Sequence, residues 1–495
     1  MPDQTIKRMT NRISYLAIVS LMLTPLAATS QDEDTGADEI VGPFEQTVPV
    51  ADEVAPPAPQ PGGVTEERLL EEFAHYRRML QSGTLDEADV SAKRIVEMAI
   101  RVYGPQSRET ASALNNLGIV QHGNSQYDAA IQNFTSSVEI LEIVEDRLNG
   151  ALVNPLKGLG AAQLGSGRPD LAQQTFNRAA HITHVNDGPH NLGQVEILES
   201  IAETFIRMGD TKEARSILDR IHVLNVKHFQ KNPMGLLPSL MNRATWQHRA
   251  GYYAEERASY RRAIRIVESS AGKNDPMLVK PLRRLGESFY YVDVNMATPQ
   301  QQGIVATGEM YFKRASRIAE KSQDFDWWEL AATKVGLADY YTFTEAQNRS
   351  RKIYREVWWS LSEGDDKLAL RNELFADPVA IRTESLPVYA GGIANSGSSR
   401  NDLIAGKVIV RYTVSSRGRV RELQTEAVPA EFTDIQRMVH REIRRRIYRP
   451  RIADGEAVDA NDLVHEHAFS YVQADLDALR AAKAPSPSEQ ETDSD

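Results

Sequence analysis

The residues best suited to metal chemistry are the two histidines of the segment His465-Glu466-His467. The alternating pattern around them predicts a strand, which places both imidazoles on one face and the carboxylate on the other. A protein zinc site needs at least three ligands, and no third ligand stands at a suitable spacing. Cysteine is absent from all 495 residues, which excludes disulfides, thiolate metal sites and a cysteine nucleophile. We therefore expect neither a metal site nor a cofactor.

Other catalytic patterns are also missing. The sequence has no phosphate-binding glycine loop and no nucleophile elbow. Acidic residues are abundant, but nothing marks any two of them as a catalytic pair. The net charge of -11 argues against nonspecific binding to nucleic acid, which needs basic surface. We expect a protein that is not an enzyme; a cell-wall enzyme, which would need a polar cluster that the sequence does not show, stays open as an alternative.

A repeating pattern of small and large apolar residues dominates the middle of the chain. From residue 66 to residue 361 the apolar spacing is helical, and glycine and proline fall at the breaks. The pair Leu117-Gly118 returns, in full or in part, at intervals of 42 residues. Three further columns keep this register: Ala130, Ala172 and Ala214; Phe134, Phe176, Leu218 and Tyr260; and the turn residues Gly83, Gly167, Gly209 and Gly251, with Ser125 in the missing place.

Each column has a packing role in a stack of helical hairpins. The small residue beside leucine lets two antiparallel helices approach, and the turn glycine ends the first helix. The large apolar residue of the second helix fills the space below the next hairpin. No hairpin can bury its apolar face alone, so stacked hairpins share one core. We predict an α-solenoid over residues 65–362, in which an insertion near 291–307 delays one helix until Gly308–Lys321.

These columns resemble the tetratricopeptide repeat, whose leucine, glycine, alanine and phenylalanine positions appear as Leu117, Gly118, Ala130 and Phe134. The long period and the segment at residues 113–118 are similar to the variant seen in kinesin light chain. The resemblance implies a superhelix whose concave face binds an extended peptide or a protein partner, through asparagine amides and arginine guanidinium groups. The repeat register places these polar residues on or near that face: Asn115, Asn116, Asn242, Arg283 and Arg284.

A different pattern follows residue 399. Residues 407–414 and 420–428 alternate as half-buried strands around a turn, and residues 431–448 carry apolar side chains at helical spacing. Residues 463–472 form a third predicted strand. We therefore predict a small α+β domain over residues 400–473, with the order strand, strand, helix, strand, after a linker at 363–399.

This order resembles the TonB carboxyl-terminal domain. The matching pieces are Gly406–Val410, the hairpin at Gly418–Val420, the helix leading to Tyr448-Arg449-Pro450, and the turn at Asp454–Val458. In that family the last strand pairs with a segment of an outer-membrane receptor by strand addition. The resemblance implies a TonB-dependent receptor or another envelope protein as partner. It also implies a partner-binding edge along the last strand, which includes Leu463, His465, His467, Phe469 and Tyr471.

The amino-terminal 30 residues predict an exported protein. Three basic residues precede the apolar run Ile13–Leu26, and small residues at 28–30 suit a cleavage site. We expect a cleaved signal peptide over residues 1–30, a disordered acidic and proline-rich linker over 31–64, and a disordered acidic tail over 474–495. The mature protein is then expected in the periplasm of a Gram-negative cell. An uncleaved anchor in the inner membrane, facing the periplasm, is the alternative.

These expectations combine into a periplasmic adapter, in which the array holds one partner and the carboxyl-terminal domain docks another. A membrane-anchored energy transducer for outer-membrane transport is the alternative, but it needs the amino-terminal segment as an anchor. An arginine cluster between Arg437 and Arg451 has two interpretations: a solvated helix face, or weak contact with an anionic membrane or peptidoglycan surface. Glu431, Asp434 and Glu442 offset part of its charge.

Overall fold

The computed structural model describes residues 65–291, 307–322, 325–383, 386 and 404–483. These residues form two compact units, one up to Glu213 and one from Ala214, and the division falls inside helix α9 (Thr211–His228). The predicted signal peptide, the acidic linker, the insertion after residue 291 and the end of the predicted tail lie outside the described residues.

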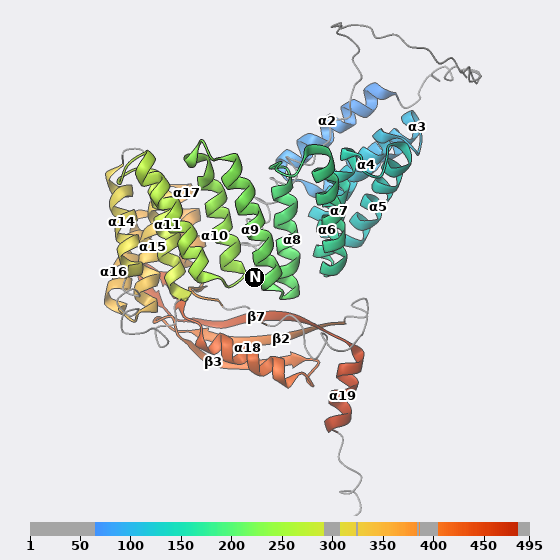
Figure 1. Ribbon diagram of the computed structural model, residues 1–495. Coiled ribbons are helices and arrows are strands. Elements are labelled where there is room, and N and C mark those ends of the chain that lie inside the picture. Colours follow the sequence, from blue (N-terminus) through green and yellow to red (C-terminus); the bar gives the residue numbers. More distant parts are fainter. Residues whose placement is uncertain (1–64, 292–306, 323–324, 384–385, 387–403, 484–495) are drawn as a thin grey trace, which may run out of the picture. The chain divides into compact units, whose positions relative to one another are not determined.

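The first unit is built from helices that pack as consecutive hairpins (Figure 1). Helices α2 and α3, α4 and α5, and α6 and α7 pair in this way. The helices are α2 (Glu66–Ser82), α3 (Leu85–Tyr103), α4 (Arg108–Gly123), α5 (Tyr127–Val144), α6 (Val153–Gly165), α7 (Pro169–Asp187) and α8 (Gln194–Met208).

The helical part of the second unit continues the same plan. Helix α14 begins at Thr307 and packs on α12, so the predicted delay of this hairpin's second helix is confirmed. The elements are α10 (Leu237–Arg249), α11 (Tyr253–Ser270), α12 (Val279–Glu287), the 3-10 turn η4 (Ser288–Tyr291), α14 (Thr307–Lys321), α15 (Trp327–Phe343), α16 (Gln347–Ser360) and α17 (Asp365–Phe375).

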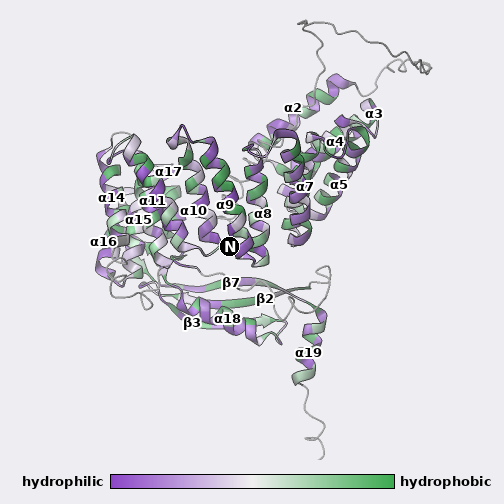
Figure 2. Cartoon of the chain, in the orientation of Figure 1, coloured by the Kyte–Doolittle hydropathy of each residue, from purple (hydrophilic) through white to green (hydrophobic). Residues whose placement is uncertain are grey.

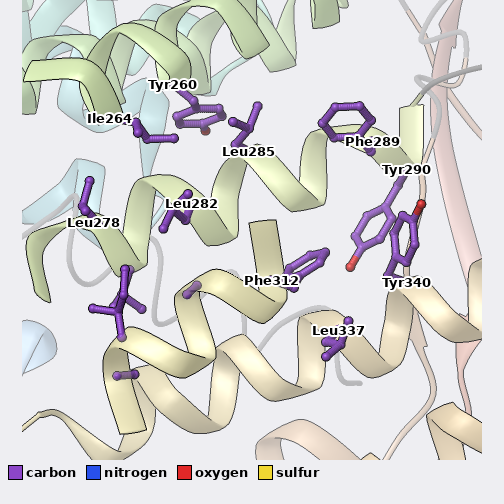
Figure 3. Close-up of a cluster of buried hydrophobic side chains, with 14 of the residues drawn as sticks. Tyr260, Ile264, Leu278, Leu282, Leu285, Phe289, Tyr290, Phe312, Leu337 and Tyr340 are labelled. Atoms are coloured by element: carbon purple, nitrogen blue, oxygen red, sulfur yellow. The ribbon is translucent and has the colours of Figure 1, made fainter. Parts of the chain in front are cut away.

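Contacts between phenylalanine and glycine explain the repeat columns. The ring of Phe134 lies against Gly118 of its own hairpin and Gly158 of the next, and a Cβ atom on Gly118 would lie 2.8 Å from the ring. Phe312 lies in the same way against Gly286 and Gly336 in the second unit. Figure 3 shows Phe312 in that core, near side chains of the neighbouring helices. Only glycine lets these helices approach so closely.

The turn column also adopts the conformation expected of it. Gly83, Gly167, Gly209 and Gly251 have φ values of 77°, 79°, 80° and 79°. Ser125 takes the same left-handed conformation with φ at 60°, although it has a side chain. The turn between α15 and α16 has the same left-handed conformation, with Glu345 at φ 62°. The register predicted from sequence is therefore the structural register at these turns.

The carboxyl-terminal region contains a three-stranded antiparallel sheet in the order β3-β2-β7. Its strands are β2 (Ile404–Val414), β3 (Val420–Val428) and β7 (Ala460–Tyr471), and α18 (Thr433–Arg445) packs on β3 and β2 (Figure 1). The helix buries Ile435, Val439 and Ile443 of its predicted apolar stripe at 0–2% exposure, whereas Ile447, the fourth predicted member, lies beyond the helix end and is half-buried. The predicted order of strand, strand, helix and strand is present.

Several boundaries predicted for this region are wrong. The predicted linker contains helix α17 and strand β1 (Val379–Ala380), because Phe375 packs in the core against Tyr354. The predicted helix ends at Arg445 rather than at residue 448, because Tyr448–Arg449 forms strand β4 and pairs with β1. A hairpin of β5 (Arg451–Ala453) and β6 (Glu456–Val458) precedes β7.

The predicted disordered tail also begins too early. Residues Gln473–Lys483 form helix α19. Leu476 is 4% exposed and lies in the same apolar cluster as Phe432, Phe469 and Tyr471, and Leu479 packs against that cluster. This apolar contact offsets the cost of ordering the chain. Within the described residues, no helix combines the length and the apolar character that crossing a membrane requires.

Candidate functional site

A polar pocket lies on the array in the second unit. Its volume is about 380 Å³, and helices α10, α11, α12 and α15 supply most of its wall. The remaining wall comes from later parts of the chain, namely Leu374, residues 379–381 and Arg449. Polar side chains from the helices include Thr245, His248, Glu256, Arg283, Arg284 and Glu287. The pocket thus joins the array to the carboxyl-terminal region.

The two arginines predicted from the repeat register lie side by side in this pocket. Arg283 is 8% exposed and is held by two carboxylates, with Nη1 2.6 Å from Glu287 and Nε 2.8 Å from Glu329. Burial alone would lower the pKa of Arg283, but Glu287 and Glu329 raise it above the ordinary value. The side chain of Arg284 is 49% exposed, and its Nη1 donates to the second oxygen of Glu287 at 3.0 Å. Arg283 is therefore structural, whereas Arg284 faces the solvent.

A buried ion pair closes one side of the pocket. Arg449 donates from Nε and Nη2 to the two carboxylate oxygens of Asp339, at 2.9 and 2.8 Å. Its Nη1 donates to the carbonyl oxygen of Leu374 at 3.0 Å, and the hydroxyl of Tyr354 donates to Asp339 at 2.7 Å. Burial and the nearby Asp339 charge raise the pKa of Tyr354 well above its ordinary value. This network fixes the carboxyl-terminal region against α15.

An extended segment of the chain itself lies beside the pocket. Strand β1 pairs with β4, and the backbone N–H of Ile381 donates to the carbonyl of Ile447 at 2.9 Å. Ile381 is buried in the same apolar cluster as Tyr290 and Phe312. The N–H of Thr383 then donates to the hydroxyl of Tyr291 at 3.3 Å. Strand β4 therefore holds this extended backbone by hydrogen bonds, and the array adds the burial of Ile381 and the hydroxyl of Tyr291.

The predicted asparagines are distributed over both units. Asn115 and Asn116 lie on α4 in the first unit, each 1% exposed, and no hydrogen bond reaches either side-chain amide within the described residues. The hydroxyl of Tyr76 donates to the backbone carbonyl of Asn116 at 3.1 Å. Asn242 is exposed on α10 and does not line the pocket. The structure thus brings together Arg283 and Arg284 of the predicted set.

The residues predicted to bind a partner lie on β7, which is an edge strand of the sheet, but their side chains are buried or half-buried instead of free for a partner. Strand β7 pairs with β2 on one side, and within the described residues its other side has no strand partner. Phe469 and Tyr471 are 3% and 6% exposed and pack around Phe432 in the core. His465 and His467 are half-buried opposite Val410 and Val408, which belong to that core. Strand β7 therefore offers a partner a backbone edge without a strand neighbour in the described part of the chain, rather than the side chains named from sequence.

The sequence did not single out Asp339 and Arg449, although one signal was present. Asp339 stands two positions after Leu337. In the earlier repeats, Glu203 stands two positions after Ile201, and Glu287 stands two positions after Leu285. Extending the repeat register past the insertion would have placed Asp339 beside Glu287 on the pocket wall. Arg449 was named only as part of the segment Tyr448-Arg449-Pro450, and nothing in the sequence indicates that it pairs with Asp339.

Comparison with known families identifies one part of the first unit. Residues 79–143 match the family model described as tetratricopeptide repeat, so the chain contains tetratricopeptide repeats, as predicted. The rest of the described chain is a mainly helical array of similar hairpins, followed by a small region of antiparallel strands and helices. No curated protein sequence matches the chain.

Several solved structures are similar to the array at low identity. A tetratricopeptide repeat protein from Parabacteroides merdae is 13% identical over 62% of this chain and 99% of that one, with a TM-score of 0.36. Aspartyl phosphate phosphatase F from Bacillus subtilis is 12% identical over 61% and 86%, with a TM-score of 0.38. The repeats of a Podosopora anserina protein assigned as a kinesin light chain are 16% identical over 41% and 97%, with a TM-score of 0.37. At these scores the likeness carries no argument about function.

Proposed function

We propose that this chain is a non-enzymatic adapter of a Gram-negative cell envelope, whose helical array binds an extended peptide segment of a partner. One observation carries the proposal: an extended segment of the same chain, Val379–Ile381, pairs with β4 and buries Ile381 in the core of the array, beside a pocket of about 380 Å³. Tetratricopeptide repeat proteins bind protein or peptide partners. A peptide entering this pocket would meet the same kinds of backbone and side-chain groups that contact the extended segment.

The charges of the pocket favour a partner with an acidic group. Arg283 is saturated by Glu287 and Glu329, so it has little left to offer a ligand. Arg284 keeps half of its side chain exposed and points one guanidinium edge at Glu287. A carboxylate of the partner, from an acidic side chain or a chain terminus, would pair with the remaining edge of Arg284.

For the carboxyl-terminal region we propose a second docking role, by strand addition in the manner of TonB-like domains. The open edge of β7, whose strand runs over 12 residues, supports this role. Backbone hydrogen bonds along such an edge supply affinity without any special side chain. Export by the predicted signal peptide would place both binding sites in the periplasm, where an envelope protein or an outer-membrane receptor would be the partner.

A displayed library of ten-residue peptides, selected on the full chain, tests the peptide-binding role. We expect an enriched acidic peptide whose affinity, measured by fluorescence anisotropy, falls at least about tenfold in Arg284→Glu, as loss of a charge-assisted pair implies. Arg317→Glu, which reverses an exposed charge on α14 outside the pocket, is the matched control and should leave the affinity unchanged. Failure to enrich any peptide, or equal affinity of both variants, would remove the pocket as the binding site.

A further inference from the structure

Helix α18 presents three arginines on its solvent side. Arg441, Arg444 and Arg445 are exposed, and none of them forms an ion pair or a side-chain hydrogen bond with the described part of the chain. Their spacing of three and four residues places them on one face of the helix. The opposite face, with Val439 and Ile443 at 0% exposure, is fixed in the core, so the helix cannot turn these arginines inward.

The acidic residues of the same helix do not neutralise this face. Asp434 accepts a hydrogen bond from Arg437 at 2.5 Å, and Glu442 lies 3.7 Å from the buried side chain of Arg446. On the adjacent strand, Glu426 pairs in register with Ile409, whereas the neighbouring Val408 and Val410 belong to the core under α18. Because side chains alternate along a strand, Glu426 lies on the far side of the sheet.

The helix end explains only part of the cluster. Arg444 and Arg445 lie in the last turn, where cations interact favourably with the helix dipole. This does not account for Arg441, nor for Met438, which is 44% exposed one turn earlier on the same side. Figure 2 shows α18 as mostly hydrophilic. Met438 is thus an exposed apolar side chain on the same side as exposed arginines. An exposed apolar residue among cations is typical of helices that lie in a membrane interface.

We propose that this face of α18, formed by Met438, Arg441, Arg444 and Arg445, docks onto a bilayer that contains anionic lipids. Each guanidinium can bind a lipid phosphate through two parallel hydrogen bonds. The Met438 side chain would enter the boundary between headgroups and acyl chains. Nucleic acid fits less well, because the chain as a whole carries a net charge of -11 and an exposed methionine has no role on a phosphate backbone.

Vesicle binding by the full chain tests this proposal independently of any peptide ligand. The probes are phosphatidylcholine vesicles with and without phosphatidylglycerol, and the readout is the ratio of the two dissociation constants. Each basic residue near an anionic surface contributes about fivefold, so replacing Arg441, Arg444 and Arg445 together by glutamine should reduce binding to the anionic vesicles about a hundredfold. Met438→Ala should weaken binding to the same vesicles while leaving its salt dependence unchanged.

The matched control replaces three exposed arginines of the first unit, Arg77, Arg78 and Arg101, by glutamine. It carries the same change in net charge and should keep the preference for anionic vesicles. Any contribution of the apolar amino-terminal segment is common to all variants and cancels in the comparison. An equal loss in the two triple variants, or a wild-type chain without preference for anionic vesicles, would overturn the proposal.

Discussion

Arg449 and Asp339 stand 110 positions apart in the chain and form a two-pronged ion pair in the buried interior of the second unit. Asp339 belongs to the last hairpin of the array, and Arg449 belongs to the short strand that follows α18. Neither side chain is more than 10% exposed. The pair therefore joins two parts of the chain that the sequence presents as separate domains.

Removing one partner of this pair should be far more damaging than removing both. Asp339→Ala leaves the Arg449 guanidinium buried without a carboxylate, and we expect a loss of about 3–5 kcal/mol in the unfolding free energy of the second unit. The double variant Asp339→Leu with Arg449→Met replaces the pair by apolar groups and should recover most of that loss. Urea unfolding, monitored by hydrogen exchange in α15 and β4, measures the loss in the single variant and the recovery in the double variant. Equal losses in the single and double variants would contradict this account.

The left-handed serine at position 125 should be replaceable with a gain in stability. A side chain in this conformation costs about 1 kcal/mol, so Ser125→Gly should stabilise the first unit by up to that amount. The matched variant is Glu345→Gly, which relieves the same backbone strain but removes an ion pair with Arg419 at 2.5 Å. We expect it to gain less. The midpoints of urea unfolding compare the stability of the two variants with that of the wild type. A destabilised Ser125→Gly variant would show that the turn needs the serine side chain.

Glu199 on α8 should make the stability of the first unit depend on pH. Burial, and then the charge of Glu196, raises the pKa of Glu199 from 4.5 to about 7. Between these values the folded state binds more protons than the unfolded state, so stability should fall as the pH rises from 4.5 to about 7. Glu199→Gln should remove this fall, whereas Glu139→Gln, at an exposed position on α5, should not. Hydrogen exchange of α8 across this pH range is the measurement; a flat profile in the wild type would exclude the effect.

The amino terminus of the mature chain distinguishes the proposed adapter from an energy transducer. Expression in a Gram-negative host should yield a periplasmic protein whose mass corresponds to a start near Gln31, because small residues precede that position. A full-length chain held in the inner membrane would instead favour the transducer. Mass spectrometry of the fractionated cells gives the answer directly.

Much of the array could be predicted because its determinants are local and repeated. The turn column at Gly83, Gly167, Gly209 and Gly251 marks a backbone conformation that depends on a single residue. The contact of Phe134 with Gly118 needs only two residues at a fixed separation within one hairpin. Such features leave a trace in the sequence each time the hairpin recurs, so even the exception at Ser125 is visible.

What the sequence did not reveal depends on single contacts between distant segments. Helix α17 is ordered by the packing of Phe375 on Tyr354, and helix α19 by the packing of Leu476 on the sheet core. Likewise, the repeat register predicted that Arg283 and Arg284 lie on the binding face. It could not show that Glu329 pairs with Arg283 and not with Arg284. Composition therefore predicted a linker and a tail where tertiary contacts form helices.

The packing of α17 and the β5–β6 hairpin on the last helical hairpin has a consequence for how this molecule can vary. Ile452 of β5 and Phe375 of α17 cover Tyr354 and Val357 of α16, on the side where a further hairpin would have to stack. A solenoid normally lengthens by duplicating a repeat, and each new repeat needs an open apolar face to stack on. Here that face is occupied by residues that follow in the same chain, so the array cannot grow at this end. Variants of different length would have to gain or lose hairpins upstream of α15.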